Sequence, residues 1–356
     1  MTIKMRIRFL LQIYMLLIVS LVMTSCSTLS RGNKDSKDQP LIVILSDSDN
    51  IQKAINSLPE EGGTVFLKAK QYMLDKGLHI NRSNIKLVGE NGTRLKLKPN
   101  VNQPIILIGS GSEVPDKKIN DIVVSDLELD GSKELQSSET DPERPWIRNN
   151  GIDIRNANRV WIEKVNIHDT RSGGLVASWN CKNLFINSSM FHNNEFDGIA
   201  LYDSEDVLVR GFFCFDNKSA GVSLDNRLKH ITFSSGSIKN NGDVGIFARD
   251  SADLKFDNII IVGNKSHGCF FSNGTWEPEK TGIRRNFFSA CSFLDNKGWG
   301  FWLASKADSS PDNTIVSSIF SGNTLGAIKV DEGGELELAG NAIKPSRNNL
   351  IKKENL

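Results

Sequence analysis

The feature that most constrains the fold of this chain is a repeat in which a glycine precedes a short segment of alternating apolar residues. The repeat glycines are Gly151, Gly174, Gly198, Gly221, Gly245, Gly268 and Gly300. Successive glycines are 23, 24, 23, 24, 23 and 32 residues apart. A near-constant period in the low twenties is typical of a solenoid, in which each repeat buries its apolar face against its neighbours. The sequence therefore predicts one elongated domain of stacked coils.

Two further columns of residues follow the same period. Seven positions before each glycine from Gly174 onward, and before Gly326, there is an apolar residue that we expect in the core: Ile167, Phe191, Cys214, Ile238, Ile261, Phe293 and Ile319. Four positions before the glycine there is an asparagine in five successive coils: Asn194, Asn217, Asn241, Asn264 and Asn296. Asparagine tolerates a left-handed backbone and can hydrogen-bond to its own copy one coil away, so we expect a ladder of amides.

The start of the chain has the pattern of an export signal. Basic residues precede an apolar run over residues 9–23, which ends in Met23-Thr-Ser-Cys26. Small residues followed by a cysteine resemble the lipobox of bacterial lipoproteins, and the resemblance implies lipidation of Cys26. An ordinary signal peptide or membrane anchor is the alternative. We expect a signal peptide over 1–25, a flexible tether over 26–39, and a lipid-anchored protein of the bacterial cell envelope that faces the periplasm or the cell surface.

The remaining chain is predicted to form a solenoid domain over residues 40–340 and a basic, loose tail over 341–356. Apolar residues at helical spacing over 51–58 follow polar capping residues and predict one helix. Such a helix would cap the first coil, whose core end is otherwise exposed. The four cysteines beyond Cys26 are expected as core thiols, and only Cys269 and Cys291 are placed closely enough to consider a disulfide.

Coils of about 23 residues with three short strands each, together with the asparagine column, resemble the right-handed parallel β-helix of the pectin-lyase-like superfamily. The resemblance covers about residues 47–340 and implies an all-β fold. Within the superfamily, residues 121–131 and 194–198 are similar in style to the catalytic modules of mannuronan C5-epimerases. Their Asp-Pro-His-Glu motif is absent, because residues 176–179 read Val-Ala-Ser-Trp. Residues 196–198 and 266–268 are partial echoes of polygalacturonase motifs, whose Asp-Asp pair is here Ser219-Ala220.

Substrates of this superfamily lie over the strands that follow the repeat glycines, where positions two and four point outward. Lyases and epimerases of uronates need a cation beside the carboxylate and a base for the acidified proton. The catalytic candidates on this face are Asp197, Tyr202, Asp225, Arg249 and His267, and the substrate-binding candidates are Trp146, Asp153, Arg155, Phe247, Phe270, Trp276 and Trp302.

Structural explanations compete with these roles. Asp225 and Arg249 are neighbours in one column and could form a cross-coil ion pair of small energy. Tyrosine is frequent in β-sheets, so Tyr202 could be purely structural. Asp197 and His267 could each do no more than stabilise the turn in which they lie. Outward rings at Phe270 and Trp302 are less easily explained without a binding surface.

These patterns favour a membrane-anchored, carbohydrate-active β-helix that acts on an acidic polysaccharide by β-elimination. A non-catalytic glycan-binding or surface-assembly module is the alternative, as is a glycoside hydrolase that uses Asp197 and Asp225. The net charge of +1 argues against a nucleic-acid partner. The histidines show no metal-ligand spacing, so no cofactor is predicted, although calcium bound by scattered acids remains open.

Overall fold

The computed structural model describes residues 41–45, 50–273, 282–304, 310–332, 334–344 and 351–353. The predicted export signal and tether, with Cys26, lie outside these ranges, and so does Trp276. Among the described residues, none of the helices combines the length and apolar character needed to cross a bilayer.

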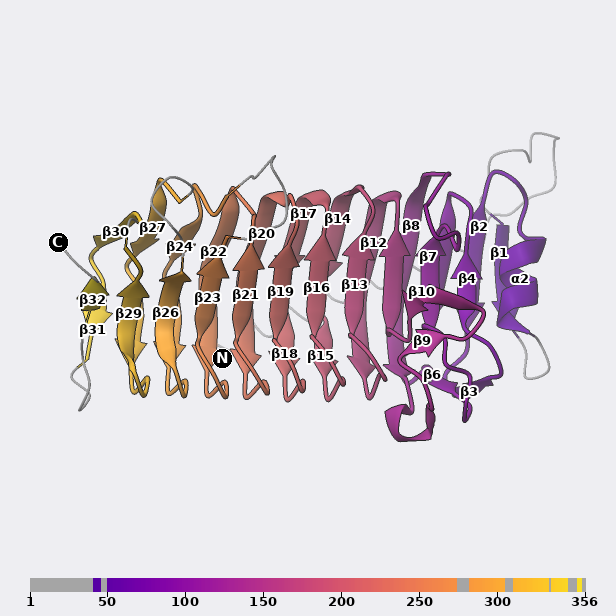
Figure 1. Ribbon diagram of the computed structural model, residues 1–356. Coiled ribbons are helices and arrows are strands. Elements are labelled where there is room, and N and C mark those ends of the chain that lie inside the picture. Colours follow the sequence, from indigo (N-terminus) through magenta and orange to yellow (C-terminus); the bar gives the residue numbers. More distant parts are fainter. Residues whose placement is uncertain are drawn as a thin grey trace, which may run out of the picture. The chain divides into compact units, whose positions relative to one another are not determined.

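The strands wind into a parallel β-helix whose coils stack along one axis (Figure 1). The first of its two sheets is called sheet B here. It contains β4 (Leu78–Ile80), β7 (Ile106–Gly109), β11 (Ile152–Arg155), β13 (Leu175–Ser178), β16 (Ile199–Tyr202), β19 (Val222–Asp225), β21 (Ile246–Arg249), β23 (Cys269–Ser272), β26 (Trp299–Ala304), β29 (Gly326–Val330) and β32 (Ile351–Lys353).

The larger sheet, called sheet A, supplies the other strands of each coil. Its early members are β1 (Leu41–Leu45), β2 (Gly63–Leu67), β3 (Gln71–Leu74), β5 (Ile85–Gly89), β6 (Arg94–Leu97), β8 (Ile119–Asp130) and β12 (Ala157–His168). Its middle members are β14 (Cys181–Asn187), β15 (Met190–His192), β17 (Ser204–Arg210), β18 (Phe213–Phe215), β20 (Lys229–Lys239) and β22 (Leu254–Val262). Its last members are β24 (Phe287–Ser289), β25 (Ser292–Leu294), β27 (Asn313–Val316), β28 (Ile319–Ser321), β30 (Leu336–Ala339) and β31 (Ala342–Ile343).

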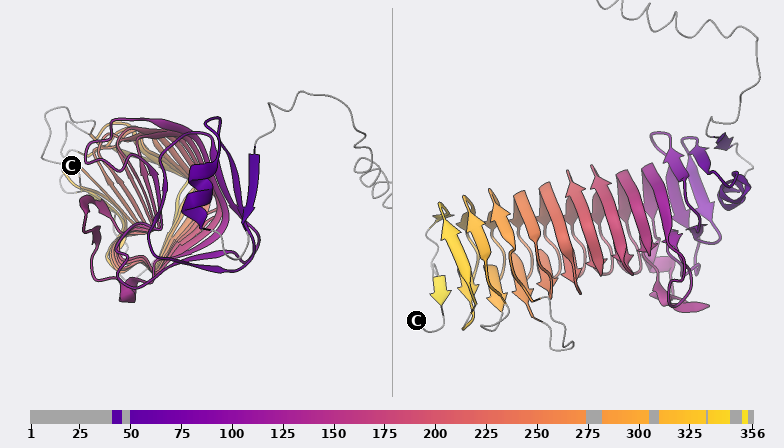
Figure 2. Two further views of the ribbon diagram at one scale, coloured as in Figure 1. Left: turned by 90° about the vertical axis from the view of Figure 1, so that its right-hand side faces the viewer. Right: turned by 90° about the horizontal axis from the view of Figure 1, so that it is seen from above.

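The predicted cap and an insertion complete the described elements. Helix α2 (Ile51–Ser57) buries Ile51, Ala54 and Ile55 at the N-terminal end of the β-helix (Figure 2). Asn50 caps it by accepting a hydrogen bond from the backbone N–H of Lys53 at 2.9 Å. Between β8 and β11 the chain forms a short 3-10 helix, η1 (Lys133–Leu135), and an antiparallel hairpin of β9 (Thr140–Asp141) and β10 (Arg144–Arg148).

The repeat glycines are required because the backbones of successive coils approach closely. A Cβ atom at Gly268 would lie 2.4 Å from the carbonyl oxygen of Gly300, and one at Gly245 would lie 2.6 Å from that of Gly268. Strands of sheet B pair in register from coil to coil, so that Ile152 lies beside Leu175 and Leu175 beside Ile199. The repeat read from the sequence is therefore the structural period of the fold.

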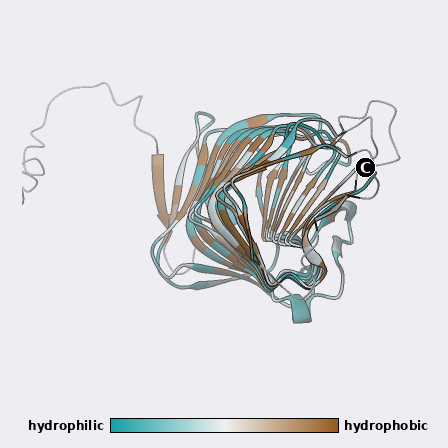
Figure 3. Ribbon diagram, turned by 90° about the vertical axis from the view of Figure 1, so that its left-hand side faces the viewer, coloured by the Kyte–Doolittle hydropathy of each residue, from teal (hydrophilic) through white to brown (hydrophobic). Residues whose placement is uncertain are grey.

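The predicted core column is confirmed except at its last member. The six residues from Ile167 to Phe293 are fully buried, but Ile319 is 38% exposed. Phe320 takes its place and stacks on Phe293 with ring centroids 4.5 Å apart. The error arose because β29 aligns Gly326 with Trp299, so that Ala327 and not Gly326 is the residue opposite Gly300. Figure 3 shows hydrophobic and hydrophilic residues interspersed along the strands of the stacked coils.

The asparagine column forms the expected ladder. The side-chain amide of Asn194 donates to the side-chain oxygen of Asn217 at 2.9 Å, and the same bond recurs along the column to Asn323. The left-handed backbone lies one residue earlier than we expected, at positions such as Asn193 and Asn240, both with φ 55°. The ladder residues are thus selected for their amides, and their neighbours are selected for the turn. The four described cysteines are buried and free, which confirms them as core thiols.

Candidate functional site

The outward face of sheet B forms a continuous row of side chains that we call the sheet B stripe. The strand pairing sets the members of its two columns side by side: Tyr202 lies next to Asp225, Asp225 next to Arg249, and Phe247 next to Phe270 and then Trp302. All five catalytic candidates lie on or at the edge of this row. The sequence therefore located one surface, and the structure divides it into a charged part and an aromatic part.

Asp225 and Arg249 form the cross-coil ion pair that was weighed as a structural explanation. The Nε atom of Arg249 donates to Oδ1 of Asp225 at 3.0 Å, and its Nη2 donates to Oδ2. Asp225 is only 4% exposed, and the Arg249 guanidinium also lies 5.7 Å from the ring centroid of Phe247. The positive charge of Arg249 is therefore balanced inside the protein. Breaking this pair would leave the buried carboxylate of Asp225 without its countercharge.

Asp197 and Tyr202 are the two groups of the stripe that could act as a base and an acid. Asp197 follows the last turn before β16 and accepts a hydrogen bond from the backbone N–H of Ala220 at 2.9 Å. Burial raises the pKa of Asp197, while a hydrogen bond from Ser219 opposes the rise. Burial, reinforced by the negative charge of Asp197, raises the pKa of Tyr202 to about 12. Asp197 is thus a stronger base than an ordinary aspartate, and the phenol of Tyr202 keeps its proton at neutral pH.

The aromatic part of the stripe is a ring cluster of Phe247, Phe270, Trp302 and His267. Ring centroids of Trp302 lie 4.8 Å from Phe270 and 5.0 Å from His267. The backbone N–H of Trp299 donates to Nδ1 of His267 at 2.8 Å, which assigns the ring proton to Nε2. Burial lowers the pKa of His267, so the neutral ring offers a hydrogen-bond donor to a ligand.

A balanced ion pair borders the ring cluster. Lys329 lies 4.4 Å from the centroid of Trp302 and 3.1 Å from a carboxylate oxygen of Asp331. Asp331 also accepts the indole N–H of Trp302 at 3.0 Å, which fixes the orientation of that ring.

Asp153 and Arg155 begin the row but are covered. They are 5% and 2% exposed, and Nη2 of Arg155 donates to the carbonyl of Glu113 at 2.8 Å. Burial raises the pKa of Asp153 to about 6 against the opposing charge of Arg155. Trp146, on β10, is 40% exposed and donates its indole N–H to the carbonyl of Gly111 at 3.1 Å. The open part of the stripe therefore begins beyond β11.

Sequence reasoning missed Arg148, the last residue of the hairpin. Its guanidinium lies 4.5 Å from the ring centroid of Phe196, directly before Asp197 in the chain. The charge of Arg148 lowers the pKa of Asp153, Asp197 and Tyr202 alike, so it reaches all three groups. The only signal in the sequence was its place in a polar insertion just before the first regular coil.

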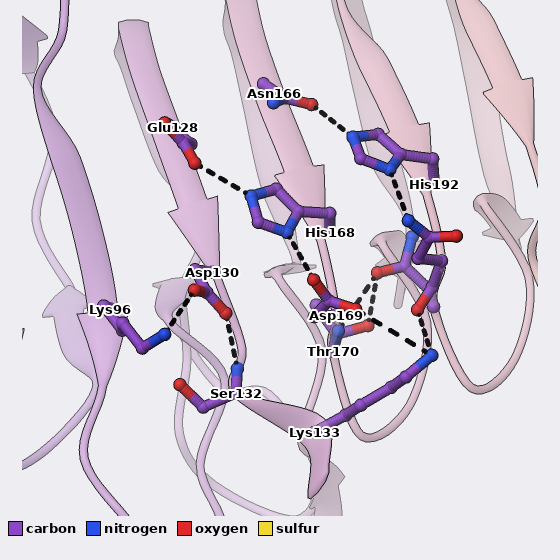
Figure 4. A network of polar contacts seen from close by, with 12 residues as sticks. Lys96, Glu128, Asp130, Ser132, Lys133, Asn166, His168, Asp169, Thr170 and His192 are labelled. Atoms are coloured by element: carbon purple, nitrogen blue, oxygen red, sulfur yellow. Dashed lines mark hydrogen bonds and ion pairs between the residues drawn. The ribbon is translucent and has the colours of Figure 1, made fainter.

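A second charged cluster lies on sheet A, away from the stripe. Figure 4 shows His168 between Glu128 and Asp169, with its ring nitrogens 3.1 and 2.8 Å from their carboxylate oxygens. Asp130 lies close enough to share a metal ion with His168 and Asp169. Its carboxylate is instead held by Lys96 at 2.9 Å and by Arg94. These cations already neutralise the acids, so the network has the chemistry of a structural clamp.

The described fold agrees with what is known of other proteins. A sequence profile described as "Right handed beta helix region" matches residues 105–279, while no curated protein matches the sequence. The mannuronan C-5 epimerase AlgE4 A-module of Azotobacter vinelandii superposes with a TM-score of 0.56 at 17% identity, over 85% of this chain and 95% of that one. Pectate lyase Pel9A superposes with a TM-score of 0.56 at 10% identity, over 79% of this chain and 71% of that one.

A third similar structure is not named as an enzyme. PfbA, a surface adhesin of Streptococcus pneumoniae, superposes with a TM-score of 0.54 at 15% identity, over 85% of this chain and 88% of that one. At these identities the likeness shows the fold alone. The chain is a right-handed parallel β-helix, an architecture that it shares with polysaccharide-acting enzymes and with an adhesin.

Proposed function

We propose that this right-handed parallel β-helix binds an extended acidic polysaccharide along the sheet B stripe and cleaves it at Asp197 and Tyr202. The observation that carries the proposal is the continuity of the ring cluster with a partly buried acid–phenol pair on one face. Four strand steps separate β16 from β26, or about 19 Å at the spacing of paired strands. A glycan that stacks on Trp302 therefore extends over Tyr202 as well. Aromatic faces and a few fixed donors are the usual means of holding a ligand of this kind.

The reaction that suits these groups is β-elimination. Asp197 takes the proton from the carbon next to the uronate carboxylate, and a carbon–carbon double bond forms as the bond to the glycosidic oxygen breaks. Tyr202 gives its proton to that leaving oxygen. The raised pKa of Asp197 favours it as the base, and the pKa of about 12 keeps Tyr202 protonated as the acid. His267 is proposed as a donor to the ligand, because its Nδ1 is already engaged.

The location of the activity is also a proposal. The apolar segment and the lipobox-like Cys26 support a lipid anchor in the bacterial cell envelope, where acidic polysaccharides are accessible. Calcium bridging between the ligand and acids of the stripe is compatible with the proposal and is tested by adding a chelator.

Digestion of acidic polysaccharides tests the reaction. The protein is incubated with alginate, pectate and glycosaminoglycans, and the ultraviolet absorbance of unsaturated uronates is followed. Asp197→Asn and Tyr202→Phe should each abolish the absorbance while glycan binding is retained. Asp206→Asn, an exposed change on sheet A, is the matched control and should keep full activity.

Two other outcomes would point elsewhere. New reducing ends without ultraviolet absorbance would indicate hydrolysis. If neither unsaturated uronates nor new reducing ends form, and Trp302→Ala weakens glycan binding, catalysis is refuted. That result would leave the second candidate, a glycan-binding module, which the ring cluster supports without any need for a reaction.

A further inference from the structure

Arg148 has a fixed position because the hairpin that carries it is closed by a backbone hydrogen bond of its own and is joined to the next coil by another. The backbone N–H of Asn149 donates to the carbonyl of Glu139 at 2.8 Å, and that of Ser172 donates to the carbonyl of Asn149 at 3.0 Å. Ile147, the preceding residue, is fully buried. Figure 1 shows the hairpin in front of the N-terminal strands of sheet B. The direction in which Arg148 leaves the backbone is therefore set by the scaffold.

The guanidinium of Arg148 is also held in one plane. Its Nε donates to the hydroxyl of Ser172 at 2.9 Å, and its Nη2 donates to a carboxylate oxygen of Glu139 at 3.0 Å. The flat face covers Phe196. Among the described residues, Nη1 has no hydrogen-bond partner. A guanidinium oriented by stacking, with one free and one exchangeable nitrogen, has the geometry of a carboxylate receptor.

Glu139 is the one carboxylate that Arg148 contacts among the residues that the structure describes. The side chains of the two residues are 45% and 42% exposed, so their contact is an exposed ion pair of low energy. An incoming carboxylate can displace Glu139 at little cost, because Glu139 then returns to water. Asp225, which is buried against Arg249, cannot be displaced in this way.

We propose that Arg148 is the specificity-determining residue of the stripe, and that Glu139 occupies the place of the carboxylate of a uronate unit until the polysaccharide binds. The inference rests on the proposed function and names the ligand chemistry at one position. The carboxylate must sit beside Phe196, and so next to Asp197, where the proton is taken. A neutral sugar gains nothing from Arg148, whereas a uronate replaces a weak, exposed contact by a stronger one beside Phe196 and positions its own acidic carbon.

Binding measurements with a matched pair of ligands test the inference. The probes are a uronate hexasaccharide and the same oligosaccharide after chemical reduction of its carboxyl groups. Isothermal titration is performed in the Asp197→Asn background, so that the acidic ligand is not consumed. Glu139→Gln should tighten binding of the acidic probe by about two- to fivefold, the factor expected for loss of an exposed competing pair.

Arg148→Gln should weaken binding of the acidic probe by about tenfold or more and leave the neutral probe unchanged. In the Arg148→Gln background, Glu139→Gln should have no further effect, because the two changes act on one contact. Arg148→Lys should restore only part of the affinity, since it keeps the charge without the fork. Arg159→Gln, which breaks the bidentate pair with Asp121 on sheet A, is the control and should change neither affinity.

The outcomes separate the two proposals. Failure of both probes to bind would refute the proposed function and this inference with it. Equal weakening of both probes by Arg148→Gln would show a structural role for the arginine and would overturn the inference alone. If Glu139→Gln binds the acidic probe no more tightly than the parent, the inference is also overturned, since removal of a competing carboxylate should increase the affinity.

Discussion

The amide ladder gives the most quantitative prediction, and Asn241→Ala is its test. Oδ1 of Asn241 accepts from both the backbone N–H and the side-chain amide of Asn217, at 3.1 and 3.0 Å. Its own amide donates to Asn264 at 2.9 Å and to the carbonyl of Cys214 at 3.2 Å. Alanine would remove all four bonds from a site that is fully buried.

The expected cost follows from what is left unpaired. The backbone N–H of Asn217 loses its hydrogen-bond acceptor, which costs about 1–3 kcal/mol for a buried donor. The side-chain amide of Asn217 still donates to the carbonyl of Phe191 at 3.0 Å, so its loss is smaller. With the two remaining bonds at about 1 kcal/mol each, Asn241→Ala should lower the free energy of unfolding by about 2–6 kcal/mol.

Guanidinium unfolding followed by circular dichroism measures this change. The control is Asn187→Ala, a partly buried asparagine of sheet A that makes one 3.3 Å contact with Glu163, and it should cost under about 0.5 kcal/mol. The double change at Asn217 and Asn241 should cost less than the sum of the single changes, because the two side chains share one bond. Equal stability of Asn241→Ala and Asn187→Ala would refute the reasoning.

Three further predictions concern the core, the stripe and pH. Phe320→Ala should destabilise the protein by about 3–5 kcal/mol and Ile319→Ala by under about 1 kcal/mol in thermal unfolding, because only the first is buried; the reverse order would contradict the register. Trp302→Ala should weaken glycan binding at least tenfold by titration without shifting the melting temperature by more than a few degrees, and unchanged affinity would exclude the ring cluster as a subsite. Asp153 has a folded pKa of about 6 and an unfolded value near 3.8, so the unfolded chain loses its proton first and stability falls as the pH rises between these values. Asp153→Asn should remove that fall, and an unchanged pH profile of the melting temperature would show that the carboxylate is not destabilising.

The fold was predictable to the extent that one period governs the chain. The glycine spacing identified the solenoid, because close backbone approach excludes a Cβ at those positions in every coil. The period failed where a coil changed length, at Gly326, since a glycine one residue out of register looks identical in the sequence. Side chains in the regular coils were thus placed correctly as inward or outward, and Ile319 was not.

The candidate site was less predictable, because its character depends on insertions that carry no period. Alternation placed Asp153 and Arg155 outward, and both do leave sheet B on that face, but nonrepetitive segments cover them. The hairpin of β9 and β10 brings Arg148 to Phe196 across two coils, a contact between residues that no spacing rule relates. The tautomer of His267 depends on a backbone donor from the next coil and is equally invisible in the sequence.

If the stripe binds a charged polymer as proposed, its ion pairs matter because each of its cations is already balanced by a carboxylate. Arg148, Arg249 and Lys329 each face a carboxylate of the same chain, in contacts with Glu139, Asp225 and Asp331. These pairs differ in burial: Glu139 is 42% exposed as a side chain, whereas Asp225 is 6% exposed. A ligand carboxylate can therefore exchange with Glu139 but not with Asp225, since only the exposed partner is resolvated on leaving. The position of the exchangeable pair beside Asp197 would then select which sugar unit of the polymer reacts.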